Sequence, residues 1–461
     1  MIECKFAGVD YLLQRACHSR CQNLQDRPSF LAKMLNMIAH NARVLRLATD
    51  DEIAAEMARV NAEEAGIRHM LPKSRHYLVK LERVRRPIVH ILKETFLSNG
   101  GDAVVNRDVI TARIEHSDVI LTGTRKQFQR ALLSLREQGF GCDALAAEVE
   151  AAIRHFDSTP SVPSSETFAD PRLRRTFELI GIRTLVMGIL NVTPDSFSDG
   201  GRYAEPSAAV DHAYEMAANG ADIIDIGGQS TRPGSEPVPI HEETDRVLPV
   251  VQELAPNLDI PISIDTYRAE VAEAALNAGA LIVNDISGAT FDAQMPELLA
   301  RRQCPAVIMH ILGTPKNMQS NPEYQDVMAD ICRFLRGRLE ALAEAGVDEK
   351  LLIVDPGIGF GKAVEHNLEI LRRLAELRSI GRPILVGTSR KATIGQVLGG
   401  LMPGDRLEGT AATVALSIAN GADIVRVHDV REMTRVARMA DSIVRRQSGC
   451  TSTLGGDTKS S

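Results

Sequence analysis

The chain has 461 residues, of which 44% are hydrophobic and 25% are charged, a balance typical of a folded globular protein. Its net charge of −7, its 4% of aromatic residues and its lack of tryptophan argue against a nucleic-acid binder. No apolar run approaches the roughly 20 residues that span a bilayer, and seven scattered cysteines suit a reducing compartment, so we expect a cytoplasmic protein without membrane partners.

The first 156 residues predict a weakly helical lead-in over residues 1–40 and an α+β accessory domain over residues 41–156, to which the sequence assigns no function. In this domain the expected helices are 50–65, 87–98, 125–138 and 142–156, and the expected strands are 77–84, 102–110 and 117–123. Residues 157–172 are rich in Ser, Thr and Pro and predict a linker. Residues 448–461 predict a disordered tail.

Residues 173–447 alternate regularly between short apolar runs and helical stretches, which predicts a (β/α)8 TIM barrel. The fold class is therefore α/β, a barrel preceded by a smaller α+β domain. The eight expected strands are 185–192, 223–227, 261–265, 281–286, 305–310, 351–355, 383–388 and 423–428.

Polar residues follow or interrupt all eight expected strands, at the end where such barrels hold their active sites. One Asn or Asp after a strand is more often a turn or a helix cap than a ligand contact. Asn284 and Arg426, however, lie within their strands, and burying such groups without partners costs about 1–3 kcal/mol each. A ligand that pairs with them is the simpler explanation. Donors and acceptors that suit a flat polar heterocycle are Asp265, Asn284, Asp355 and Lys391. Residues that suit an anion such as a phosphate are Arg232, Arg426 and His428, with Asn191.

Seven segments together resemble the dihydropteroate synthase family over residues 183–446: MGILNVTPDSFSDGG, DIGG-STRPG, SIDT, VNDIS, VDPGIGFGK, GTSRK and RVHDV. The resemblance implies condensation of 6-hydroxymethyl-7,8-dihydropterin diphosphate with 4-aminobenzoate, which gives 7,8-dihydropteroate and diphosphate. It also implies Mg²⁺ as cofactor and a homodimer formed through the barrel helices.

The resemblance also assigns roles to individual residues. Pterin contacts would come from Asp265, Asn284, Asp355 and Lys391, with Ile286 and Met309 as apolar walls. The diphosphate would be held by Asn191, which faces the Mg²⁺, with Arg426 and His428. Thr231 and Arg232 would lie in a second mobile loop, and the aminobenzoate would be bordered by Phe197, Pro233, Phe360 and Lys391. The implied catalytic residues are Asn191, Asp265, Lys391, Arg426 and His428.

The stretch from residue 193 to residue 201 is interpreted as a lid, because Gly200 and Gly201 give it conformational freedom. The functional side chains of this lid would be Asp195, Phe197 and Asp199. Two positions depart from the family pattern: Gln229 stands where Glu is frequent, and Ala392 where Ser is frequent.

Two alternative functions stay open at this point. The first is a pterin-dependent methyltransferase of the same barrel superfamily, which needs no diphosphate site. The second is a non-catalytic pterin-binding homologue whose N-terminal module contacts a partner. No pattern of a fused pyrophosphokinase is found in residues 1–170, so we expect an accessory module for oligomerisation or docking.

Overall fold

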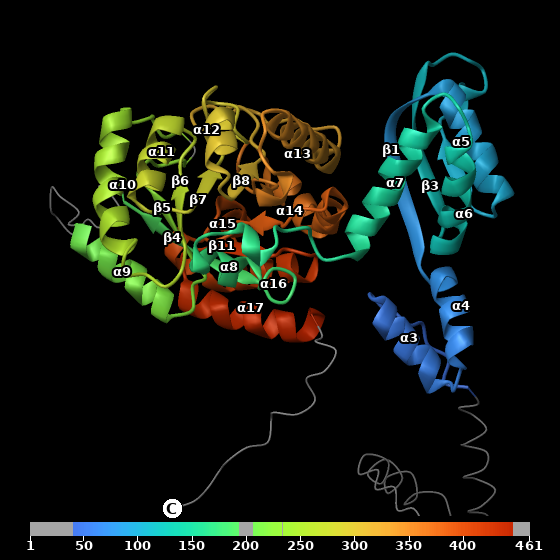
Figure 1. The fold of residues 1–461 in the computed structure, drawn as a ribbon, viewed down its shortest axis with the longest axis horizontal. Helices are drawn as coiled ribbons and strands as arrows, with labels where there is room; N and C mark the ends of the chain where they lie inside the picture. Colours follow the sequence, from blue (N-terminus) through green and yellow to red (C-terminus); the bar gives the residue numbers. More distant parts are fainter. Residues whose placement is uncertain (1–39, 193–205, 233, 446–461) are drawn as a thin grey trace, which may run out of the picture. The chain divides into compact units, whose positions relative to one another are not determined.

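The computed structural model describes residues 40–192, 206–232 and 234–445. The expected tail and all but the last residue of the expected lead-in thus lie outside the described residues. By its contacts the chain divides into two compact units. The described residues up to Leu78, with Thr122–Gln127, form the smaller unit; Val79–Leu121 and the described residues from Phe128 onward form the larger one. Figure 1 labels many of the helices and strands of each unit.

The smaller unit contains two short helices where one helix was expected over residues 50–65. Helix α3 (Asp50–Arg59) begins at a capping box built on Thr49. Asn61 has a φ of 60°, a left-handed conformation that no α-helix continues through. Helix α4 (Glu64–Ser74) then starts anew. The single-helix prediction is wrong because hydrophobic periodicity does not reveal one left-handed residue.

A small three-stranded sheet, in the order β1-β3-β2, precedes the barrel in the chain. The elements of this region are β1 (His76–Arg85), α5 (Arg86–Ser98), β2 (Asp102–Val105), β3 (His116–Thr124), α6 (Arg125–Arg136) and α7 (Cys142–Asp157). Phe96 and Phe128 pack edge to face in its core, with ring centroids 5.0 Å apart. The strand expected over residues 102–110 is wrong in its second half, because Asn106 caps the 3-10 helix η1 (Arg107–Val109).

The segment expected as a linker is ordered in its second part. It contains the 3-10 helix η2 (Ser165–Thr167) and leads into helix α8 (Pro171–Phe177). The rings of Phe168 and Phe177 pack 4.9 Å apart. Both belong to an apolar cluster with the first residues of the barrel strands, including Leu185. The segment therefore closes the N-terminal end of the barrel, opposite the end where the polar residues gather.

Eight parallel strands form the predicted barrel. They are β4 (Leu185–Asn191), β5 (Ile223–Gly227), β6 (Ile262–Asp265), β7 (Ile282–Asp285), β8 (Ala306–Met309), β9 (Leu352–Asp355), β10 (Leu385–Val386) and β11 (Ile424–Val427). Neighbouring strands pair in chain order, and β11 pairs with β4. A parallel bridge between Val354 and Ile384 joins β9 to the segment just before β10 and closes the barrel.

Helices surround the barrel, as Figure 1 shows. They are α9 (Pro206–Ala218), α10 (Ile240–Leu254), α11 (Ala269–Ala278), α12 (Met295–Arg302), α13 (Val327–Glu344), η4 (Glu349–Leu351), α14 (Val364–Arg373), η5 (Leu374–Ile380), α15 (Ala392–Val397), η6 (Pro403–Asp405), α16 (Leu407–Ala419) and α17 (Val430–Val444). The main core lies between them and the outward side chains of the strands, such as Ile224 and Ile226. Among the described residues, no helix has the length and hydropathy to cross a membrane.

Candidate active site

Arg426 lies inside strand β11, and its guanidinium joins two carboxylates from other strands. Its Nε donates to Asp225 Oδ2 and its Nη2 donates to Asp265 Oδ2, both at 2.6 Å. The same Asp225 oxygen accepts a hydrogen bond from Asn284 Nδ2 at 2.9 Å. Burial opposes the charge of Arg426, but Asp225 and Asp265 raise its pKa above the usual value, so the guanidinium stays charged. Four strands are thus tied together at the barrel mouth.

Three buried oxygen atoms beside this cluster have no hydrogen-bond partner among the described residues: Asp225 Oδ1, Ser263 Oγ and Asp265 Oδ1. Asp225 and Ser263 are paired across β5 and β6, so both side chains lie on the inner side of the sheet. Burial raises the pKa of Asp265 to about 7, an effect that Arg426 opposes and Asp225 reinforces. Buried acceptors without partners are costly, so a ligand that donates to them is favoured here.

Asp355 and Lys391 stand on neighbouring parts of the same mouth. Asp355 ends β9, and its Oδ1 accepts a hydrogen bond from the Gly357 amide at 2.7 Å. Burial raises the pKa of Asp355 to about 6, whereas burial and Arg426 lower the pKa of Lys391 to about 8. The ammonium of Lys391 lies 4.1 Å from the centre of the Phe360 ring, a cation–π contact.

His428 follows β11 and is held by Ser389, which follows β10. The Ser389 hydroxyl accepts from the His428 backbone amide at 3.1 Å and lies 3.0 Å from His428 Nδ1. Burial and the charge of Arg426 lower the pKa of His428 to about 3. The imidazole is therefore neutral. Arg390 is engaged by Asp429 through both Nε and Nη2.

An apolar wall adjoins these polar groups. Its buried members, and two partly buried rings packed on them, are Ile286, Met309, Ile311, Met318, Tyr267 and Phe360. The wall unites Ile286 and Met309, which the resemblance assigned to the pterin, with Phe360, which it assigned to the aminobenzoate. Polar strand ends on one side and an apolar wall on the other suit a flat heterocycle with several polar edges.

Asn191 stands at the C-terminal end of β4 and pairs in register with Gly227 of β5. It lines a hollow that also contains His428, Arg390 and Asp429. The structure thus brings Asn191 and His428, both assigned to the anion, to the same hollow.

Gln229 ties the loop after β5 to its neighbours through two hydrogen bonds. Its Nε2 donates to Tyr267 Oη at 2.9 Å, and its Oε1 accepts from the Val238 amide at 3.2 Å. Thr231 is partly buried and Arg232 is exposed. Among the described residues, no hydrogen bond links the side chains of Thr231 or Arg232 to the other site residues. Asp195, Phe197, Asp199 and Pro233, assigned to the lid and the second substrate, lie outside the described residues.

The sequence prediction assigned no role to Asp225 or Ser389. The signal for Asp225 is its position inside the apolar strand IIDIG, where a carboxylate needs a buried partner. No comparable signal exists for Ser389, because its partner His428 lies 39 residues away in the chain.

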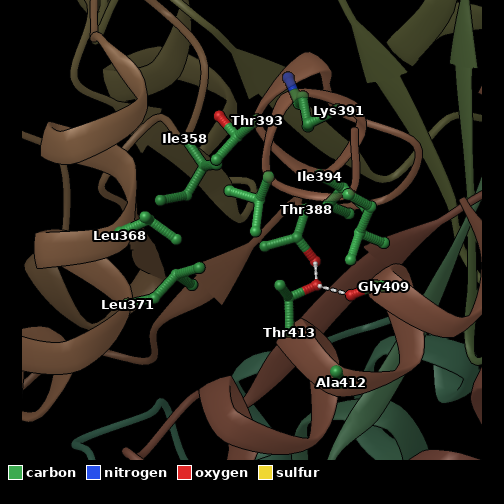
Figure 2. Close-up of a pocket in the computed structure, with 12 residues that line it drawn as sticks. Ile358, Leu368, Leu371, Thr388, Lys391, Thr393, Ile394, Gly409, Ala412 and Thr413 are labelled. Carbon is green, nitrogen blue, oxygen red and sulfur yellow. Dashed lines mark hydrogen bonds between the residues drawn. The ribbon is translucent and has the colours of Figure 1, made fainter. Parts of the chain in front are cut away.

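A separate apolar hollow of about 160 Å³ lies between α14, α15 and α16 (Figure 2). Thr413 donates to Thr388 Oγ1 at 3.0 Å beside it, and Lys391 is its one charged lining residue. Its lining otherwise consists largely of aliphatic side chains such as Leu371 and Ile394. This composition does not suit a polar heterocycle or an anion, so the barrel mouth is the better candidate for the active site.

Comparison with known proteins finds relatives of the whole barrel. A family model described as pterin binding enzyme matches residues 187–428. The dihydropteroate synthase of Synechocystis sp. is 50% identical over 265 residues, which cover 58% of this chain and 92% of that protein. A crystal structure of dihydropteroate synthase from Clostridium difficile in the presence of pteroic acid aligns with a TM-score of 0.55 and 50% identity, covering 58% of this chain and 98% of that chain.

The N-terminal region has a likeness of its own. A probable bifunctional folylpolyglutamate synthase/dihydropteroate synthase of Haloferax volcanii is 38% identical over 394 residues, covering 85% of this chain and 46% of that protein. This alignment is longer than the barrel and the C-terminal tail together, so it includes part of the region before residue 173.

Proposed function

We propose a chemistry for the barrel mouth from the premise that this chain belongs to the family of pterin binding enzymes. Its activity is that of a dihydropteroate synthase, a transferase of folate biosynthesis. The observation that best supports the site is the combination of partnerless buried oxygens beside Arg426 with the apolar wall at Met309 and Phe360.

In the proposed reaction, the amine nitrogen of 4-aminobenzoate forms a bond to the methylene carbon of the pterin diphosphate. The bond from that carbon to the diphosphate oxygen breaks, diphosphate leaves, and the amine nitrogen releases one proton. Asp265, Asn284 and Asp355 would hold the polar edges of the pterin, and Lys391 would lie at the border of both substrates. The proposal is supported by the burial of Asn284 and Asp355, by the partial burial of Asp265 and Lys391, and by the charged state of Arg426.

Arg426 and His428 would stabilise the negative charge that develops on the departing diphosphate. Arg426 is fixed by two carboxylates and His428 by Ser389, so little reorganisation is needed when the charge appears. Preorganised donors of this kind are usually the largest single contribution to catalysis. A neutral His428 contributes as a hydrogen-bond donor rather than as a charge.

Mg²⁺ fits the residues present. The side-chain oxygen of Asn191 is a hard ligand at the hollow that also contains His428, and Mg²⁺ is often bound by one or two protein oxygens together with substrate phosphates. Asn191 would hold the ion, which would supply positive charge to the leaving diphosphate.

The activity is tested by diphosphate release in a coupled assay with both substrates. We expect release only when pterin diphosphate and 4-aminobenzoate are both present; omission of the amine is the control. Pterin binding without release would favour the non-catalytic homologue. Methyl transfer from a methylpterin to a corrinoid, without diphosphate release, would favour the methyltransferase.

We propose a homodimer through the barrel helices that follow β10 and β11. Large apolar side chains are exposed on α15, α16 and α17, with Val397 at 54%, Leu416 at 58% and Ile443 at 62% exposure. We expect Leu416→Glu with Ile443→Glu to convert a dimer to a monomer in light scattering. Ile240→Glu, on α10 after β5, serves as control and should leave the mass unchanged. A monomeric wild type would contradict the proposal.

We propose that residues 41–156 form an accessory domain, that residues 157–172 connect it to the barrel and that residues 173–447 form the pterin-binding barrel. The alignment with the Haloferax protein includes part of the region before residue 173, which supports a domain joined to the barrel in that relative as well. Helix α7 packs along η5 of the barrel, and the guanidinium of Arg378 lies 5.4 Å from the centre of the Phe156 ring. These contacts support a docking function for α7.

A further inference from the structure

Lys362 is a buried cation beside the proposed pterin site whose role the proposed mechanism leaves open. Only 2% of its surface is exposed, yet none of the ion pairs among the described residues includes it. A lysine is almost never buried to this extent unless its ammonium is fully hydrogen-bonded. The neighbours of its ammonium therefore indicate what the residue does.

The ammonium makes three hydrogen bonds, one for each of its protons. It donates to His310 Nδ1 at 2.9 Å, to the His310 carbonyl at 3.3 Å and to the Phe360 carbonyl at 2.9 Å. Burial lowers the pKa of His310 to about 3, so the imidazole is neutral and its Nδ1 can accept. The ring of His310 is in turn held edge-on by Phe334, with 5.1 Å between the centroids.

These bonds join two segments that both contribute to the pterin site. His310 comes directly after Met309 at the end of β8, whereas Phe360 and Lys362 belong to the loop after β9. The same loop approaches β8 very closely at Gly357, where a Cβ would lie 2.0 Å from the His310 carbonyl oxygen. A small outward movement of the loop would therefore displace the apolar wall and the turn that orients Asp355.

We propose that Lys362 is a positioning residue, whose hydrogen bonds hold the loop after β9 against β8 and thereby set Asp355 for pterin binding. All three ammonium protons are used within the protein, so Lys362 does not touch the substrate. This inference rests on the proposed function. The two fail differently: an inactive wild type refutes the function, whereas an active wild type with an unaffected Lys362 variant refutes the inference alone.

The first test is Lys362→Met, which keeps the length of the side chain and removes its donors. We expect the KM for pterin diphosphate to rise about tenfold, as for the loss of one net hydrogen bond, with kcat within about threefold of wild type. Lys350→Met, the same change at an exposed lysine, is the matched control and should alter neither constant. A wild-type pterin KM in Lys362→Met, with normal thermal unfolding, would overturn the proposal.

The pH profile separates positioning from mere structural support. Burial lowers the pKa of Lys362 to about 7, with Asp355 raising it and Lys391 lowering it. Above that pH the amine has two protons for three acceptors, so the wild-type pterin KM should rise as pH passes through about 7. This rise should be smaller in Lys362→Met, where only Asp355, Lys391 and Asp265 still titrate. An identical rise in the variant would refute the role of Lys362.

A second pair of variants keeps the test valid if Lys362→Met folds poorly. His310→Asn places an acceptor near the position of Nδ1 and should keep the pterin KM within about threefold of wild type, whereas His310→Leu should raise it. If both side chains act through one contact, their effects on the pterin KM should not add. The KM of the double variant Lys362→Met/His310→Leu should then be no higher than that of the more impaired single variant. Additive effects of the two substitutions would overturn the link.

Discussion

Replacing Arg426 with methionine should lower the rate by about 10²–10³ or more and destabilise the protein. The rate falls because a fixed donor to the leaving diphosphate is lost. The stability falls because Asp225 and Asp265 lose the cation they share, and an uncompensated buried charge typically costs about 3–5 kcal/mol. Diphosphate release and thermal unfolding measure the two effects.

The loss of stability should depend on pH in a definite direction. The pKa of Asp265 is already raised to about 7, and removing Arg426, which opposes this shift, raises it further. A carboxyl whose folded-state pKa is raised favours folding in its protonated form, so its contribution is lost as pH rises through the folded pKa. Unfolding temperatures of Arg426→Met should therefore fall more steeply above pH 7 than those of wild type.

Arg426→Lys is the control that keeps the positive charge but not the shape of the guanidinium. A lysine ammonium keeps the positive charge but lacks the planar fork that reaches Asp225 and Asp265 together. We expect it to recover most of the stability and little of the activity. Full activity of either variant would show that Arg426 has no part in the chemistry.

The barrel was predictable because its strands are buried on both sides and read as short apolar runs at regular spacing. The positions of polar residues at the strand ends then follow from the fold, without knowledge of any contact. What the sequence could not provide is pairing across the barrel. The partners of Arg426 lie 201 and 161 residues away, and no local pattern reports such a distance.

Outside the barrel the prediction was less complete, for local reasons. The left-handed residue Asn61 divides one expected helix, and the cap Asn106 shortens one expected strand. Composition suggested a featureless linker because Ser and Pro are frequent there. The segment nevertheless buries Phe168 against Phe177 at the base of the barrel, a contact that only the tertiary fold supplies.

Replacing Asp355 with asparagine should separate binding from stability. The Asn oxygen can keep the hydrogen bond from the Gly357 amide, so the turn after β9 should persist. The other carboxylate oxygen becomes an NH₂ group, which turns an acceptor toward the pterin into a donor. Two opposed donors leave both groups without a partner, and a site built on hydrogen bonds discriminates strongly against such a mismatch. We expect pterin affinity to fall by roughly 100-fold in calorimetry.

The same variant should unfold at an equal or higher temperature than wild type above pH 6. Burial raises the pKa of Asp355 to about 6, so at higher pH the wild type carries an ionised carboxylate that is more costly folded than unfolded. Asparagine removes that cost. Asp348→Asn is the matched control: Asp348 is exposed, caps a turn just before β9 through the Lys350 amide at 3.0 Å, and should leave pterin affinity unchanged. Wild-type affinity in Asp355→Asn would show that the pterin lies elsewhere. Lost pterin affinity with retained stability would show that Asp355 serves binding rather than folding.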